Sequence, residues 1–188
     1  MEKQILIQYQ SKGRELAQAA HSSEWEKIDG IIETLVSLLE QYVKIKKLNL
    51  ANELPVAYLD YAIIILRNGR YKSEAKYAIP YLLKAEEYQA SALKLSPTFP
   101  VELYSNMYTA CDMCGDYEKA FYSIEKSIDF VLNFYAEDDV NRKSSILTIV
   151  NDPFLMKHEY DQYRSKIQEW KELAENISIS AHDDEDWS

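Results

Sequence analysis

Glycine and proline are scarce in this 188-residue chain, which contains four glycines and five prolines. Both residues interrupt helices, so their scarcity favours long helical segments over a fold built from many turns. Cysteine is also rare, and two cysteines cannot form the disulfide framework of a small secreted domain. We therefore expect a fold that depends on its hydrophobic core and a protein that works in a reducing compartment.

The chain also lacks the apolar segments that direct a protein to or through a membrane. It contains no run of 18 or more apolar residues, and the first residues, MEKQILIQYQSKGREL, show neither a continuous apolar stretch nor a small-residue cleavage site. We expect a cytoplasmic protein without a membrane span. Hydrophobic residues make up 47% of the chain, which is enough for one domain over residues 1–176 to bury a full core.

Motifs typical of catalysis or of bound cofactors are missing as well. The sequence contains no glycine-rich phosphate loop, no G-x-S-x-G turn and no H-E-x-x-H helix, and its three histidines are scattered. Cys111 and Cys114 have the spacing of a redox motif, but they fall at the end of an expected helix, where the helix dipole raises a thiol pKa. We interpret them as packing residues and predict no catalytic residue, no cofactor and no metal.

What the sequence does contain is a helical pattern, with apolar residues at three- and four-residue spacing. Three turns interrupt it, and each carries an aromatic residue 46 positions after the previous one: Trp25, Tyr71 and Tyr117. At the third turn Gly115 can end one helix in a left-handed conformation, and Asp116 can cap the next. The pattern predicts an all-α fold of stacked antiparallel hairpins with seven or eight helices, no sheet, and Tyr71 and Tyr117 buried inside their hairpins.

The predicted units cover residues 2–50, 54–97 and 101–135, followed by a closing helix at 152–175 and an acidic, flexible tail at 177–188. Ser22 or Ser23 is expected to cap the second helix, and Asp152-Pro153 to start the closing one. A long helix at 71–95 should kink or restart at Pro80.

Segment 54–68 is apolar nearly all round, which predicts a helix at the centre of the fold. The three consecutive isoleucines at 63–65 leave a buried strand as the alternative.

Segment 101–134 resembles a tetratricopeptide repeat in its length, its GDYEKA turn, and the apolar residues Ile124 and Leu132. The second unit keeps part of this pattern, at Tyr58, Ala62, Gly69, Tyr71, Ala92 and Pro97, and the first unit keeps Trp25. The longer helices are equally typical of a HEAT-like or other α-solenoid. The resemblance implies that the first helices of successive units form a groove for peptides or protein segments.

Projected onto this chain, the groove implies six partner-binding residues: Leu59 and Ile63 in the second unit, and Glu102, Ser105, Thr109 and Asp112 in the third. The Lys and Asn residues with which chaperone-binding members of the family hold a C-terminal carboxylate have no counterpart at these positions. The groove is apolar in one half and acidic in the other, which suits a basic or amphipathic segment.

The net charge of −10 is unevenly distributed along the chain. Residues 1–100 hold 13 Lys and Arg against 12 Asp and Glu, whereas residues 101–188 hold 8 against 19. An acidic half repels nucleic acid and attracts basic proteins. We therefore predict a non-catalytic adaptor or scaffold that binds another protein, with no nucleic acid or membrane partner and with self-association left open. The alternative is an immunity protein or antitoxin that inhibits a basic toxin or nuclease through an acidic surface.

Overall fold

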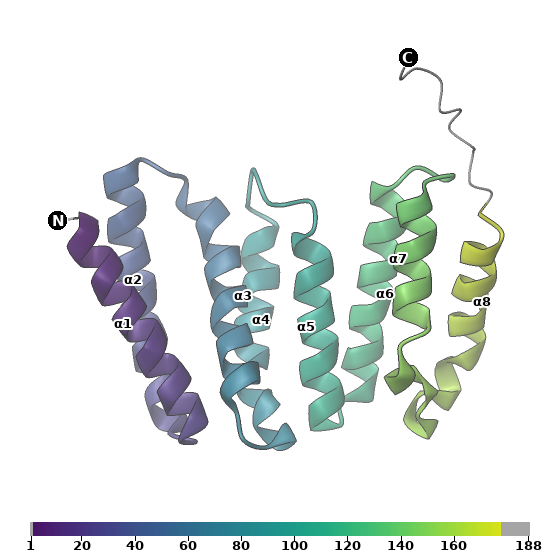
Figure 1. The fold of residues 1–188 in the computed structure, drawn as a ribbon, viewed down its shortest axis with the longest axis horizontal. Coiled ribbons are helices and arrows are strands. Elements are labelled where there is room, and N and C mark those ends of the chain that lie inside the picture. Colours follow the sequence, from purple (N-terminus) through teal and green to yellow (C-terminus); the bar gives the residue numbers. More distant parts are fainter. Residues whose placement is uncertain (1, 178–188) are drawn as a thin grey trace, which may run out of the picture. The chain divides into compact units, whose positions relative to one another are not determined.

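The computed structural model describes residues 2–177, and all of the regular structure in this range is helical (Figure 1). The eight α-helices are α1 Glu2–His21, α2 Ile28–Lys46, α3 Leu50–Asn68, α4 Ile79–Gln89, α5 Phe99–Cys114, α6 Tyr117–Phe134, α7 Val140–Val150 and α8 Arg164–Glu175. The predicted all-α hairpin fold is confirmed, and residues 63–65 lie in α3 rather than in a strand. Apart from Ile177, the expected acidic tail at 177–188 lies outside the described residues.

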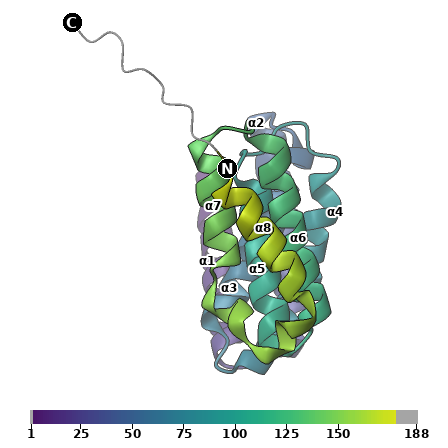
Figure 2. The same ribbon diagram turned by 90° about the vertical axis from the view of Figure 1, so that its right-hand side faces the viewer.

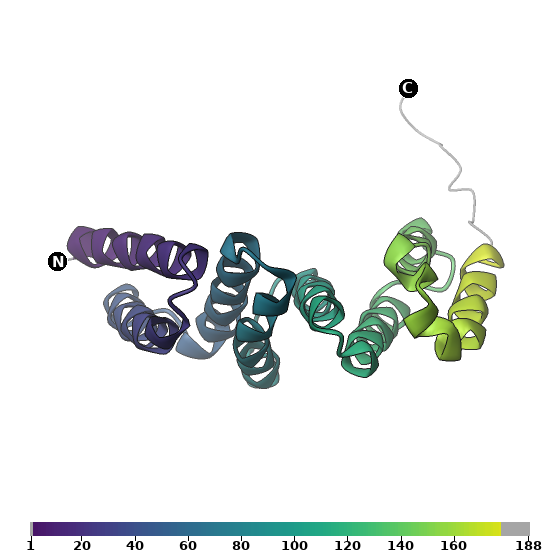
Figure 3. The same ribbon diagram turned by 90° about the horizontal axis from the view of Figure 1, so that it is seen from below.

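The chain divides into two compact units, Met1–Ala120 and Phe121–Ser188. In the first unit α1 packs against α2, and α3 packs against α4. Contacts between α1 and α3 join these two pairs, and contacts between α4 and α5 attach α5 to the second pair. Figure 3 shows α1 above α2 and α3 above α4. The first unit is therefore two stacked helical hairpins followed by α5.

Helix α3 is the central element of this unit, as its apolar sequence predicts. It contacts each of the other four α-helices of the unit. Its buried residues are Pro55, Ala57, Tyr58, Leu59, Tyr61, Ala62 and Ile65. Its N-terminus is capped by Asn49, whose side chain accepts a hydrogen bond from the backbone N–H of Ala51 at 3.1 Å.

The turn after α5 has the chemistry that the sequence predicts. Gly115 adopts a left-handed conformation with φ of 78°, which glycine reaches without steric cost. The side chain of Asp116 then accepts a hydrogen bond from the backbone N–H of Lys119 at 3.2 Å and caps α6. The neighbouring Tyr117 is half-buried rather than fully enclosed.

The turn between α1 and α2 differs from the prediction. Ser23 has a left-handed φ of 56°, and its hydroxyl donates to Glu74 Oε1 at 2.7 Å instead of capping a helix. In the part of the chain that the structure describes, no side chain caps the 3-10 helix Trp25–Lys27 that precedes α2. The expected serine cap is therefore wrong, because Ser23 is held by a carboxylate that lies 51 residues further along the chain.

Two of the predicted helices are shorter than expected. The segment after α3 forms a 3-10 helix, Lys72–Tyr77, and α4 restarts with Pro80 in its first turn and ends at Gln89 rather than near residue 95. Asp152 accepts the predicted capping bond, from the backbone N–H of Phe154, but it starts the 3-10 helix Pro153–Met156. A second 3-10 helix, His158–Tyr163, follows before α8 begins.

In the second unit α7 packs against α8 (Figure 2), and aromatic rings join α6 to α8 and to the segment before it. Phe121 of α6 stacks on Tyr163 with ring centroids 3.8 Å apart, and lies 5.6 Å from Trp170 of α8. Arg164 donates to the backbone carbonyls of Leu155, Met156 and Lys157, which fixes the loop before α8. Among residues 2–177, no helix has the length and apolar character needed to cross a bilayer.

Candidate functional site

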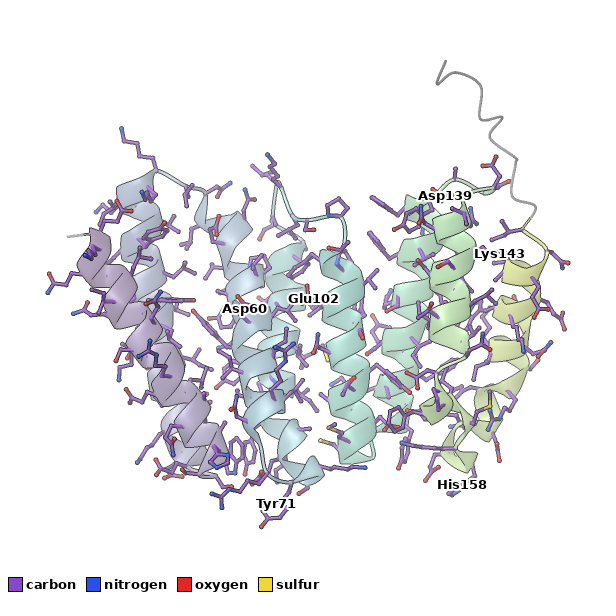
Figure 4. All side chains as sticks on the ribbon, in the orientation of Figure 1. Asp60, Tyr71, Glu102, Asp139, Lys143 and His158 are labelled. Atoms are coloured by element: carbon purple, nitrogen blue, oxygen red, sulfur yellow. The ribbon has the colours of Figure 1, made fainter. Side chains whose placement is uncertain are left out.

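The neighbouring helices α3 and α5 each present one side to solvent. We call this surface the α3–α5 face and define it by Val56, Asp60 and Ile63 of α3 with Glu102 and Ser105 of α5. On α3 the three residues are four and three positions apart, the spacing that keeps side chains on one side of a helix. Figure 4 shows Asp60 and Glu102 at similar heights on the two helices.

Asp60 and Glu102 form an acidic centre on this face. Both residues are exposed, and neither side chain has a hydrogen bond or ion pair with another described residue. The pKa of Asp60 is raised, first by partial desolvation of its carboxyl group and then by the negative charge of Glu102. The two carboxylates therefore repel each other and are paired with no cation of the described residues, and a basic side chain from a partner can supply one.

The six partner-binding residues implied by the sequence differ in their exposure to solvent, and five of them reach the surface at least in part. Glu102 and Ser105 are exposed, whereas Ile63, Thr109 and Asp112 are half-buried. The hydroxyl of Thr109 donates to the backbone carbonyl of Ser105 at 2.9 Å, so it is already used within α5.

Leu59 is only 3% exposed and belongs to the core, which corrects its placement in the groove. Successive residues on a helix are rotated by ~100°, so Leu59 turns inward while the next residue, Asp60, turns outward. Asp60 is not among the six residues implied by the sequence. Its signal was that it is the one acidic residue in the apolar segment 54–68.

A second surface lies on α2, α3 and α4, where a cleft of about 480 Å³ opens. We call it the α2–α4 cleft and define it by Asp29, Glu33 and Glu40 of α2, Tyr58 of α3, and Tyr81 and Lys84 of α4. Carboxylates and aromatic rings together are a suitable lining for a cation, because both attract positive charge.

The polar groups of the cleft are partly engaged with one another. The hydroxyl of Tyr81 donates to Asp29 Oδ1, and the ammonium group of Lys84 lies 5.3 Å from the ring centroid of Tyr58 and 5.8 Å from that of Tyr81. Burial raises the pKa of both tyrosines, and Glu40 adds to the effect at Tyr58 while Asp29 and Glu33 add to it at Tyr81. The lining thus contains three carboxylates and one ammonium group, so the cleft is negative.

The charge count along the chain concealed this acidic cleft, because residues 1–100 are close to neutral as a whole. A positional signal was nevertheless available. Asp29, Glu33 and Glu40 are spaced by four and seven residues, which places all three on one side of a helix.

The two cysteines and the possible metal ligands are the remaining candidates for chemistry. Burial raises the pKa of both free thiols, that of Cys111 to about 12, so both remain protonated and weakly nucleophilic at neutral pH. Within residues 2–177, no group of three His, Cys, Asp or Glu side chains lies close enough to hold a metal ion.

Membership of the tetratricopeptide-repeat family stays a prediction from residues 101–134. No family model matches the chain, and neither the curated proteins nor the solved structures with which it was compared gave a match.

Proposed function

We propose that this protein is a non-catalytic interaction module that binds a basic or amphipathic segment of another protein, in the manner of a tetratricopeptide-like adaptor. The Asp60–Glu102 pair is the observation that supports this most strongly. Two exposed carboxylates lie on neighbouring helices, no described residue forms an ion pair with either, and the charge of Glu102 contributes to the raised pKa of Asp60. A lysine or arginine of a partner relieves their repulsion, so binding supplies a charge that the free protein lacks.

The apolar residues beside this pair suit an amphipathic partner. Val56 is 40% exposed, and Ile63 is half-buried; they lie on either side of Asp60 along α3. A segment that carries a basic residue between apolar ones can therefore place its charge at Asp60 and Glu102 and bury its apolar side chains against α3.

The pair also carries a cost for the free protein, which is typical of functional residues. A carboxyl group whose pKa is raised by folding binds a proton more tightly in the folded than in the unfolded chain. Ionised Asp60 therefore destabilises the fold at neutral pH. Surface positions that lower stability without any structural role are commonly retained for binding or catalysis.

A peptide titration tests the proposal. The probe is a fluorescein-labelled amphipathic peptide of Lys and Leu at helical spacing, and its counterpart carries Glu in place of Lys. We expect the fluorescence anisotropy of the basic peptide to rise when it binds the protein. Its affinity should fall as the salt concentration is raised from about 0.05 M to 0.5 M. The acidic peptide should stay free.

Two double variants show whether the α3–α5 face is responsible. Asp60→Asn with Glu102→Gln should lower the affinity for the basic peptide by about tenfold. Glu26→Gln with Glu118→Gln removes the same charge from exposed acidic residues outside the face and should change the affinity by less than about twofold. Equal effects of the two double variants, or equal binding of the two peptides, would refute the proposal.

A dedicated inhibitor of a basic toxin or nuclease is the second candidate, favoured by the excess of 19 acidic over 8 basic residues in 101–188. Such an inhibitor recognises a folded surface, so it would leave the basic peptide free while binding the intact toxin rapidly. The test is to mix this protein with the product of a neighbouring reading frame and to measure the toxic or nuclease activity of that product. Loss of its toxic or nuclease activity on addition of this protein would favour the inhibitor over the adaptor.

A further inference from the structure

The α2–α4 cleft already holds a cation, and that cation belongs to the protein itself. The Lys84 ammonium lies within 6 Å of both the Tyr58 and Tyr81 ring centroids, the range in which a cation is attracted to an aromatic ring. Lys84 is exposed, so its long side chain can leave the rings without disturbing the core. The cleft therefore binds a positive charge, and the Lys84 ammonium that now lies there can be displaced.

The charge balance of the cleft leaves room for a second cation. Asp29 is engaged by the hydroxyl of Tyr81, whereas Glu33 and Glu40 accept no hydrogen bond from any described residue and form no ion pair with one. One ammonium group cannot compensate three carboxylates. A cavity of about 480 Å³ also lies in the size range of sites that enclose a ligand group.

We infer that the α2–α4 cleft is a second binding site, which takes an arginine side chain of a partner protein and displaces Lys84 from the two tyrosine rings. An arginine fits this lining better than a lysine, because its planar guanidinium can stack on a ring and donate to carboxylates at the same time. The site lies on other residues than the α3–α5 face. Its failure would leave the function proposed for that face unaffected.

An NMR titration with a minimal probe tests the inference. The probe is acetyl-Gly-Arg-Gly-amide, and its control is the citrulline peptide, which has nearly the same shape without the charge. We expect saturable amide shifts confined to α2, α3 and α4 around the cleft for the arginine peptide. The citrulline peptide should give none. Equal shifts from both peptides, or shifts centred on Asp60 and Glu102, would overturn the inference.

Two cleft variants should change the affinity for the arginine peptide in opposite directions, which separates a binding effect from a folding defect. Glu33→Gln with Glu40→Gln should weaken binding of the arginine peptide about fivefold or more. Lys84→Met should strengthen it by about threefold or more, because the ammonium group that competes for the rings is removed and the cleft loses one positive charge. A variant that unfolds cannot gain affinity, so unchanged or weaker binding to a folded Lys84→Met protein would overturn the displacement of Lys84.

Two further arms establish the specificity of the cleft. Glu26→Gln with Glu118→Gln, the matched pair outside the cleft, should leave binding of the arginine peptide unchanged, and a loss equal to that of the cleft variant would overturn the site. Spermidine distinguishes a protein side chain from a small polycation. Tighter binding of spermidine than of the arginine peptide would overturn the assignment to a partner protein.

Discussion

The hairpin turn at Glu74 and the α3–α5 face at Asp60 place a carboxylate in opposite surroundings within one unit. Glu74 is 8% exposed and accepts hydrogen bonds from the Ser23 hydroxyl and from the backbone N–H groups of Arg70 and Tyr71, at 2.7, 2.7 and 2.9 Å. These donors, with Ser23 the largest contributor, lower its pKa. Asp60 is exposed, its carboxylate accepts no hydrogen bond from any residue in 2–177, and its pKa is raised.

This difference separates two roles for an acidic residue. Glu74 is satisfied by the chain itself and joins the turn after α1 to the turn after α3, so it stabilises the fold. The carboxylate of Asp60 accepts no hydrogen bond from the described residues, so its charge lowers stability. Under the proposed function, that charge is available to a partner. The predictions that follow test this separation.

The largest expected effect is that of Glu74→Ala. The substitution leaves three donors without their acceptor, two of them backbone N–H groups, and it disconnects the two turns. We expect the melting temperature to fall by about 8 °C, measured by circular dichroism. Glu26→Ala, at an exposed position, is the control. Similar melting temperatures for the two variants would show that Glu74 does not hold the turns together.

The next effect concerns the aromatic residues of the same two turns. Trp25 stacks on Tyr77, with centroids 4.2 Å apart and ring planes 5° from parallel, whereas Tyr71 is 67% exposed and points away from the helices (Figure 4). We expect Trp25→Ala to lower the free energy of unfolding by ~2 kcal/mol and Tyr71→Ala to change it by less than ~0.5 kcal/mol. Chemical denaturation measures both, and a larger loss for Tyr71→Ala would reverse this assignment.

The exposed Tyr71 shows where the sequence pattern fails. The 46-residue spacing made Tyr71 the equivalent of Trp25 and predicted a buried ring, which is wrong. In the turn between α3 and α4 the packing contact is made by Tyr77, six residues later, and the turn is held by Glu74. The spacing of residues along the chain predicts equivalent positions, but the burial of a side chain depends on which helix it contacts after folding.

Local features of the fold could be predicted from the sequence, and contacts between distant segments could not. The left-handed Gly115, the caps at Asp116 and Asp152, and the central position of α3 all follow from neighbouring residues. The Ser23–Glu74 bond and the approach of Asp60 to Glu102 join residues 51 and 42 positions apart. No local pattern specifies such pairs, so the surroundings of Glu74 and Asp60 could be established only from the structure.

The pH dependence of stability should have opposite signs at the two carboxylates. The pKa of Glu74 is lowered, so its contribution is fully present above the unfolded-state value of ~4.3 and is lost as the pH falls through the folded-state value. The pKa of Asp60 is raised, so its destabilising effect is present above the folded-state value and disappears as the pH falls towards ~3.9.

Melting curves between about pH 7 and pH 3 measure both effects against neutral replacements. With acidification, the deficit of Glu74→Gln relative to the unmodified protein should shrink, and so should the advantage of Asp60→Asn. Glu26→Gln provides the baseline for an exposed carboxylate. A deficit of Glu74→Gln that grows on acidification, or an Asp60→Asn variant that is less stable than the unmodified protein at pH 7, would contradict these signs.

The most direct test measures stability and binding on one variant, Asp60→Asn. Removing a repelled charge should raise the melting temperature by about 1–2 °C at pH 7, while removing the charge that receives the partner should weaken binding of the Lys/Leu peptide by about threefold or more. We predict that the two quantities move in opposite directions. A variant that gains stability and keeps its affinity, or that loses both, would contradict a role for Asp60 in binding a basic segment.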